Sequence, residues 1–234
     1  ATVTPCPLYE RIGVKVDGEY RQLNANILQI ENEYYTSMRP KQPPQGNEKP
    51  TVGLRRRGVA YVELRSVDIN PLEPLGVNET QLRFLETFLL FCLLNESPPF
   101  DAEERAMIDD NQMAVALTGR DPALVLRRRR DPALPLRRWA DEIFGLLQPI
   151  CALLDMGEAR QPYATALAEQ HETLAEPERT PSARIVAAMR ASGENFFRYA
   201  RRWSEQHRHH FESRPLAEER IRVFTEAAER SLRE

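Results

Sequence analysis

Acidic, basic and tyrosine side chains alternate with apolar ones in the segment 58–67, where Glu63 and Arg65 stand two positions apart. Such alternation predicts a β-strand, in which residues two positions apart share one face. The segment 27–35 alternates in the same way. The residues that would share one face of this second strand are Gln29, Glu31, Glu33 and Tyr35. Carboxylate oxygens are ligands for Mg²⁺ and a guanidinium neutralises phosphoryl charge, so two such neighbouring strands would suit a magnesium and phosphate site.

A solvent-facing sheet explains the same alternation. Antiparallel sheets often leave one face to water, where Glu and Arg pair across strands for about 0.2–1 kcal/mol each. In either case the opposite face of the segment 58–67 should be core, with Val62 and Leu64 buried. Because both interpretations predict one pattern, the spacing by itself does not decide between a binding site and a solvated face.

The other strand signals also lie early in the chain. Residues 12–16 alternate and are followed by Asp17-Gly18, a pair typical of a tight hairpin turn. The segment 40–51 is rich in Pro, Gly and polar residues, which predicts a loop between the second and third strands. These signals together predict a small antiparallel sheet.

Helical signals begin at Asn78. Asn78 with Gln81 three positions later is the capping-box pattern of a helix start, and apolar residues then recur at helical spacing. The further predicted helices span residues 102–118, 137–156 with Pro149 as a kink or break, 162–175, 181–191, 195–211 and 216–232. The pattern as a whole predicts an α+β fold. We expect residues 1–77 to form one wall of a cleft and residues 78–234 to pack behind and beside the sheet.

Composition argues against two classes of partner. The 234-residue chain has 32 basic and 35 acidic residues and a net charge of -3, so we expect no nucleic-acid partner. Its longest apolar run, residues 88–94, is far shorter than the roughly 20 residues of a membrane span, so we expect no membrane partner. Cys6, Cys92 and Cys151 are widely spaced, and the latter two lie in apolar helical surroundings, which predicts reduced buried thiols in a cytoplasmic protein.

Two clusters suggest binding roles but have simpler explanations. The run Arg127–Arg130 belongs to a short duplicated segment and is flanked by Asp121 and Asp131, so a solvated loop is the favoured interpretation. His207 and His210 would share a helical face, but no Cys or carboxylate at metal-site spacing accompanies them. A surface or packing role is favoured for these histidines.

Three longer stretches carry a resemblance to a known family. They are Asn24-Ala-Asn-Ile-Leu-Gln-Ile-Glu-Asn-Glu-Tyr-Tyr35, Met38-Arg-Pro-Lys41 and Gly58-Val-Ala-Tyr-Val-Glu-Leu-Arg-Ser-Val-Asp-Ile-Asn-Pro71. Shorter matches follow in the same order at Gly76-Val77, Arg83-Phe-Leu85 and Ser182-Ala-Arg-Ile185. Together these stretches closely resemble the C-terminal half of the proteobacterial type of glutamate–cysteine ligase. The resemblance implies that the strands belong to a glutamine-synthetase-like catalytic sheet.

The same resemblance implies an activity and its residues. Enzymes of this family activate the γ-carboxylate of glutamate as an acyl phosphate with ATP, and the amino group of cysteine then displaces phosphate, in the first step of glutathione biosynthesis. Matched residue by residue, Glu63 corresponds to a Mg²⁺ ligand and Arg65 to the catalytic arginine that faces the transferred phosphate. Tyr35 corresponds to a tyrosine that binds the substrate cysteine. The implied cofactor is Mg²⁺, with ATP as co-substrate.

The resemblance also implies a partner. The family's remaining metal-binding acids and its catalytic histidine lie in a half that precedes Ala1, so we expect this chain to be inactive alone and to need that N-terminal half. Two alternatives stay open from the residues. One is a related carboxylate–amine ligase with another amine acceptor, and the other is a non-catalytic helical interaction module.

Overall fold

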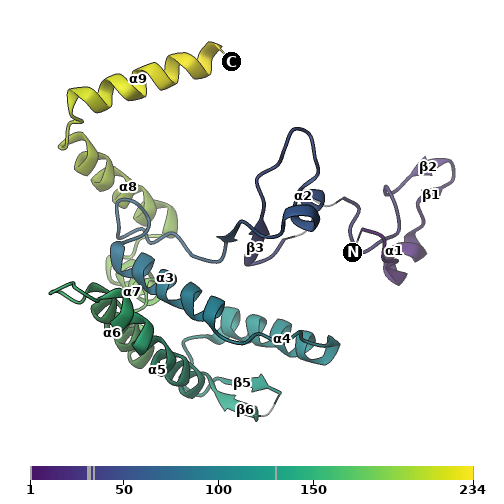
Figure 1. The fold of residues 1–234 in the computed structure, drawn as a ribbon, viewed down its shortest axis with the longest axis horizontal. Helices are drawn as coiled ribbons and strands as arrows, with labels where there is room; N and C mark the ends of the chain where they lie inside the picture. The colour runs from purple at the N-terminus through teal and green to yellow at the C-terminus, as the bar shows by residue number, and fades with distance from the viewer. Residues whose placement is uncertain (1, 31–32, 34, 130, 234) are drawn as a thin grey trace. The chain divides into compact units, whose positions relative to one another are not determined.

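The structure is a computed structural model that describes residues 2–30, 33, 35–129 and 131–233 (Figure 1). The chain divides into two compact units, Ala1–Asp68 and Ile69–Glu234. The first unit holds short strands and short helices, and long helices dominate the second. The predicted α+β fold with a mainly helical region is confirmed, but in place of one small antiparallel sheet the described residues form three separate two-stranded sheets.

Short elements make up the described part of the first unit. In chain order they are α1 (Pro7–Ile12), β1 (Lys15–Val16), β2 (Glu19–Tyr20), β3 (Met38–Lys41), α2 (Pro50–Arg57) and β4 (Tyr61–Leu64). β1 pairs with β2 and β3 pairs with β4, both antiparallel. Asp17 and Gly18 have φ angles of 53° and 87°, and a type I′ turn requires positive φ at both of its central residues. The turn predicted there is confirmed.

The strand predicted over residues 12–16 is shorter than expected. Ile12 is the last residue of α1, and Gly13 ends that helix with a φ angle of 77°, which glycine adopts without a steric penalty. The chain therefore pairs with β2 only through the two residues of β1.

The partner of β4 differs from the strand predicted over residues 27–35. β4 pairs with β3, and no described residue of that segment belongs to a strand, while Glu31 lies outside the described residues. Local side-chain bonds explain the difference. The Gln29 side chain accepts a hydrogen bond from Leu23 N at 2.5 Å, and Asn24 Nδ2 donates to Gln29 O at 2.9 Å. The second bond occupies Gln29 O, a backbone acceptor that a strand ladder would need.

β3 and α2 both overlap the segment 40–51 that was predicted as a loop. Pro40 lies inside β3, where its missing N–H is tolerated because each strand of a two-stranded sheet is an edge strand. Pro50 is the first residue of α2, a position at which its N–H would have no partner within the helix. Gly58, with a φ angle of 76°, ends α2 and leads the chain into β4.

The face of β4 that was expected in the core remains accessible. Val62 is 40% exposed, so its predicted burial is wrong, and Leu64 is of intermediate exposure. A two-stranded sheet without further cover cannot bury one face. The buried hydrophobic residues of the described chain all belong to the second unit. They are Met107, Leu126, Leu134, Leu147, Cys151, Ala166, Leu167, Ala183 and Tyr199.

Helices dominate the second unit. Its elements are α3 (Glu79–Leu94), α4 (Ala102–Thr118), β5 (Val125–Arg128), β6 (Asp131–Pro135), α5 (Leu136–Leu154), α6 (Pro162–Ala175), the 3₁₀-helix η2 (Pro177–Arg179), α7 (Pro181–Ser192), α8 (Phe196–Glu212) and α9 (Glu218–Arg233). The predicted helices are confirmed, and Pro149 lies inside α5. Within the described residues, no helix combines the length and the apolar character needed to cross a membrane.

α3, α5 and α6 pack around a common core, and Figure 1 shows α5 and α6 running side by side. Leu147 and Cys151 of α5 are 0% and 1% exposed, and Leu167 of α6 is 7% exposed. Aromatic side chains surround them, with the rings of Phe84 and Phe144 stacked at a centroid distance of 5.6 Å. Apolar burial in this three-helix core is the main source of stability that the described chain contains.

The arginine run of the second unit lies in a hairpin, which corrects the predicted loop. β5 and β6 pair across it, and Arg130 lies outside the described residues. The other three arginines form ion pairs, which join Arg127 to Asp110, Arg128 to Asp131 and Glu142, and Arg129 to Asp101 and Glu104. The duplicated segment therefore attaches α4 and α5 to a β-hairpin.

The cysteines are free thiols whose burial differs. Cys151 is buried in the core, as expected, and burial raises the pKa of its thiol. Cys92 is exposed on α3, so its predicted burial is wrong. Its neighbours Leu93 and Leu94 are also exposed, while Phe91 in the same turn packs against the helical core.

The capping box at the start of α3 supplies a test of the fold. Gln81 N donates to Asn78 Oδ1 at 2.9 Å, and Asn78 N donates to Gln81 Oε1 at 3.0 Å. Replacement of Asn78 by Ala should lower the free energy of unfolding by about 1 kcal/mol, because it leaves a helix-end N–H without its partner. Urea unfolding followed by circular dichroism measures the change. Asn95→Ala at the other end of α3 is the control and should have a smaller effect, so equal losses would contradict this prediction.

Candidate functional site

The register between β3 and β4 gathers charged side chains onto one face of the sheet. Arg39 lies opposite Glu63, and Lys41 lies opposite Tyr61. Opposite residues of an antiparallel pair point to the same face. Arg65 N donates to the carbonyl oxygen of the residue before β3 at 2.8 Å, which continues the ladder by one position. The side chain of Arg65 therefore lies on the same face of the sheet as that of Glu63.

Arg65 brings the three sequence-predicted site residues together. Its guanidinium carbon lies 4.3 Å from the centre of the Tyr35 ring, and its Nη2 donates to the Tyr35 hydroxyl at 3.3 Å. Its Nε lies 3.7 Å from Glu63 Oε1. Tyr35 reaches the cluster from the segment before β3 and not from a neighbouring strand. Stacking and hydrogen bonding together hold the guanidinium in one orientation.

Lys41 forms the closest charge contact of the cluster. Its Nζ lies 2.9 Å from Glu63 Oε2. The Lys41 ammonium bonded to Glu63 lowers the pKa of that carboxyl below its ordinary value, and the positive charges of Arg65 and Arg39 act in the same direction. Partial desolvation opposes them but is outweighed. Glu63 is therefore ionised at neutral pH.

The sequence interpretation missed Lys41 and Arg39. Both lie in the stretch that resembles a known family, but the predicted second strand ended at residue 35 and the predicted loop began at residue 40, so neither was placed on a strand. Alternation was the available signal, since Arg39 and Lys41 are two positions apart, as Glu63 and Arg65 are. Pro40 between them obscured it, because proline is typical of loops.

The cluster favours anions and offers one ligand to a cation. Three positive side chains, Arg39, Lys41 and Arg65, share a face with a single carboxylate, that of Glu63. The Glu63, Lys41 and Arg65 side chains are 38%, 33% and 26% exposed, so a ligand can reach part of each, although Glu63 Oε2, the oxygen beside Lys41 Nζ, is itself buried. Nowhere in the described residues do three or more His, Cys, Asp or Glu side chains form a group that could hold a metal ion. A complete cation site would need further ligands from outside the described residues.

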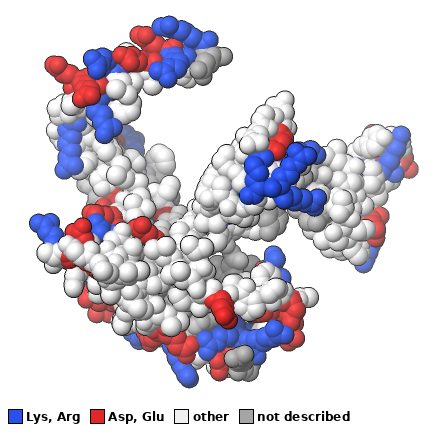
Figure 2. Space-filling model, in the orientation of Figure 1, with Lys and Arg blue, Asp and Glu red and all other residues white. Residues whose placement is uncertain are grey.

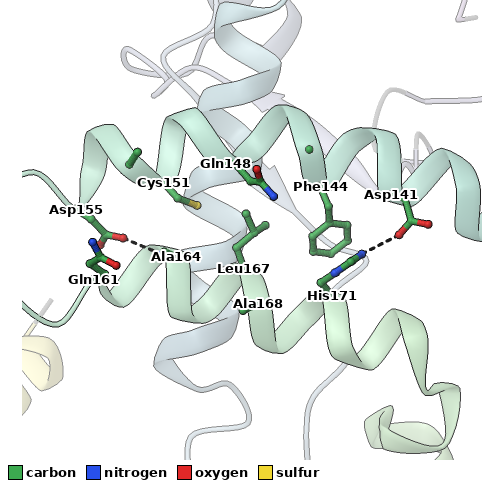
Figure 3. Close-up of a pocket in the computed structure, with 12 residues that line it drawn as sticks. Asp141, Phe144, Gln148, Cys151, Asp155, Gln161, Ala164, Leu167, Ala168 and His171 are labelled. Atoms are coloured by element: carbon green, nitrogen blue, oxygen red, sulfur yellow. Dashed lines mark hydrogen bonds and ion pairs between the residues drawn. The ribbon is translucent and has the colours of Figure 1, made fainter.

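Away from this charged face, a groove between α5 and α6 has a volume of about 710 Å³ (Figure 3). Its floor is apolar, with Phe144 and Leu167 among its lining residues, and His171 lies 2.7 Å from Asp141 at one end. The Asp155 carboxylate accepts hydrogen bonds from two backbone N–H groups at the start of α6. These polar groups thus have partners within the helix pair. The sequence-predicted site residues all lie elsewhere.

The remaining charged clusters have structural partners. His207 Nε2 lies 2.7 Å from Pro71 O, which is consistent with the predicted packing role. Figure 2 shows a concentration of basic side chains at α2, where Arg55 to Arg57 form the last turn. Arg57 pairs with Glu48 and also donates to Pro43 O at 3.0 Å, so it ties α2 to the preceding loop.

Comparison with known proteins places the charge cluster inside a region that a family model matches. A family model described as glutamate-cysteine ligase matches residues 1–115, which include Tyr35, Lys41, Glu63 and Arg65. A curated glutamate–cysteine ligase from Pseudomonas paraeruginosa is 45% identical over all 234 residues. Over its whole length the chain is similar to glutamate–cysteine ligases.

Two further glutamate–cysteine ligases show the same similarity. The enzyme of Azotobacter vinelandii is also 45% identical over 234 residues. A crystal structure of glutamate–cysteine ligase from Francisella tularensis, solved in complex with AMP, superposes with a TM-score of 0.73 at 34% identity and covers 89% of this chain. The chain spans 44% of the length of the curated relatives and 42% of the Francisella chain.

The charge contacts of Glu63 generate a direct prediction. In the wild-type chain, the Glu63 carboxyl should titrate below the usual glutamate pKa of about 4.3. Lys41→Met should raise that pKa, because the ionised carboxylate loses its nearest cation. Carbon NMR of the labelled carboxyl group measures the midpoint directly. Lys49→Met, which removes a lysine outside the sheet face, should leave it unchanged, and identical midpoints for wild type and Lys41→Met would refute the electrostatic assignment.

Proposed function

We propose that this chain is the C-terminal half of a glutamate–cysteine ligase and forms part of its ATP and metal cleft. The observation that carries the proposal is the cluster of Tyr35, Glu63 and Arg65 within the region that matches the family. The enzyme joins the γ-carboxylate of glutamate to the amino group of cysteine in the first step of glutathione biosynthesis, in the cytoplasm. Since the chain spans 44% of the length of its relatives, the partner we infer is the N-terminal half of the same enzyme.

Arg65 serves the phosphoryl-transfer step. A γ-carboxylate oxygen of glutamate attacks the γ-phosphorus of ATP, which forms γ-glutamyl phosphate and releases ADP. The protein takes little part in the covalent chemistry of such a transfer. Its main contribution is a fixed positive charge that stabilises the negative charge on the phosphoryl oxygens. The Arg65 guanidinium supplies that charge because its contacts to Tyr35 and Glu63 hold its orientation before substrate arrives.

Tyr35 serves the second step. The cysteine amino group attacks the carbonyl carbon of the acyl phosphate, the bond to the phosphate oxygen breaks, and the nitrogen loses a proton as the amide forms. Tyr35 is 76% exposed and its hydroxyl accepts a hydrogen bond from Arg65. The same hydroxyl retains its own proton, which it can donate to the carboxylate of a bound cysteine. Tyr35 thus orients the amine acceptor beside the arginine that faces the phosphate.

Glu63 is the residue of this chain that would hold Mg²⁺. Its carboxylate is ionised and its side chain is partly exposed, which fits a hard cation, but a full coordination shell needs oxygen ligands from the N-terminal half. When bound, Mg²⁺ neutralises the negative charge of the phosphate groups. This division explains how Glu63 can be necessary and yet not form a metal site alone.

Substitution of Glu63 tests the proposed metal role. In the complete enzyme, Glu63→Gln should reduce turnover by about 100-fold or more, because the amide keeps the shape of the side chain and removes the charge that a hard cation requires. Thermal unfolding should change little. Glu19→Gln in the exposed β2 strand is the matched control and should retain full activity. Wild-type turnover of Glu63→Gln at limiting Mg²⁺ would contradict the assignment.

The isolated chain provides a second test. We expect the helical unit to fold, because its core lies within residues 69–234, and we expect no γ-glutamylcysteine formation from ATP, glutamate and cysteine. In-line phosphoryl transfer needs several carboxylate ligands for its metal ions, and this chain supplies Glu63. Addition of the N-terminal half as a separate chain should restore product, measured by chromatography. Clear turnover by the isolated chain would show that the site has been misplaced.

A further inference from the structure

Lys41 has no role in the proposed reaction, although it makes the shortest contact to the proposed metal ligand. Its Nζ lies 2.9 Å from Glu63 Oε2. The two residues are diagonal neighbours across the β3–β4 pair, since Arg39 is directly opposite Glu63. Long side chains on diagonal positions can meet across an antiparallel pair. The contact is therefore built into the register of the sheet.

The two cations that contact Glu63 are held differently. Arg65 is fixed by the ring and hydroxyl of Tyr35, at 4.3 Å and 3.3 Å, and lies 3.7 Å from Oε1. Glu63 is the one described side chain that pairs with Lys41. Lysine has a flexible four-carbon stem and a compact charge, so its head group can move while the backbone stays in place. Arg65 is thus a fixed charge, whereas Lys41 is a charge that can leave Glu63.

A divalent cation and an ammonium group compete for the same carboxylate oxygen. A cation bound to Oε2 would repel a positive charge that remained within about 3 Å, because like charges at that distance repel strongly even at a protein surface. The ammonium would then be free on a face that also carries Arg39 and Arg65. Three positive groups on one face form a site for the phosphate oxygens of a nucleotide.

We propose that Lys41 is an exchangeable counter-ion of Glu63, which a divalent cation displaces so that the ammonium becomes available to nucleotide phosphates. This proposal rests on the proposed function, in which Glu63 is a metal ligand. It makes Lys41 a positioning residue that couples two binding events. Because such coupling is reciprocal, a bound nucleotide that engages Lys41 also strengthens cation binding at Glu63.

The test measures Mn²⁺ binding to the complete enzyme by electron paramagnetic resonance, with and without ADP. Without nucleotide, Lys41→Met should tighten Mn²⁺ binding about two- to five-fold, which corresponds to the loss of one partly exposed competing ion pair. The extra affinity that ADP confers on Mn²⁺ should shrink in the same variant. Lys41→Arg keeps the charge and should stay closer to wild type, and Lys49→Met should match wild type.

Three outcomes would overturn the proposal, and they separate it from the proposed function. If Glu63→Gln weakens Mn²⁺ binding but Lys41→Met leaves it unchanged, Lys41 is not a competitor and the metal role of Glu63 stands. If Lys41→Met weakens Mn²⁺ binding, Lys41 supports the carboxylate and displacement is wrong. If Glu63→Gln leaves Mn²⁺ binding unchanged, the metal role of Glu63 fails and the exchange fails with it. Lys41→Gln repeats the measurement should Lys41→Met fold poorly by circular dichroism.

Discussion

The antiparallel register between β3 and β4 is the constraint on which the candidate site depends. It places Arg39 opposite Glu63 and brings Lys41 within reach of the same carboxylate. A slip of one residue would turn every side chain of β3 to the other face, because the side-chain period of a strand is two. Pro40 would then face Glu63, and both basic residues would point away from it. Backbone hydrogen bonds at both ends of the pair, from Ala60 N at 2.9 Å and Arg65 N at 2.8 Å, maintain the register.

The first unit holds this register without a core of its own. Its described residues include no buried hydrophobic side chain, and the faces of its sheet are partly exposed. Exposed ion pairs contribute little to folding stability, so the contacts of Glu63 and Arg65 cannot replace apolar burial. The second unit, by contrast, buries Leu147, Cys151 and Leu167 between three helices. The candidate site therefore lies in the unit whose stability would increase most if its exposed apolar surface were buried. The proposed N-terminal half would bury that surface.

The helices were predictable because their signals are local. The capping box of Asn78 and Gln81, and the prolines that open α6 and α7, act within one helical turn. α3 starts directly after its predicted cap, and α6 and α7 lie within one residue of their predicted ends. Strand pairing depends on residues far apart in sequence, and there the prediction failed. The segment before β3 was expected to pair with β4, but the bonds of Gln29 and Asn24 hold it in a loop.

The same distinction explains which site residues could be found. Glu63 and Arg65 lie two positions apart on one strand, so alternation alone put them on one face, whereas Tyr35 received its role through a family resemblance. Lys41 could not be found in this way, because the strand that holds it contains Pro40 and a proline in a sequence pattern indicates a loop.

The charges of this face also indicate how the two halves of the enzyme would divide the chemistry. Three basic side chains surround one carboxylate, so the face by itself attracts phosphate and opposes a divalent cation. A magnesium-dependent transfer needs the reverse balance near the metal, with several carboxylates around it. Under the proposed function, those carboxylates belong to the N-terminal half. This chain would then supply the fixed guanidinium, the acceptor-binding hydroxyl and one shared ligand, and catalysis would require both surfaces to meet at Glu63.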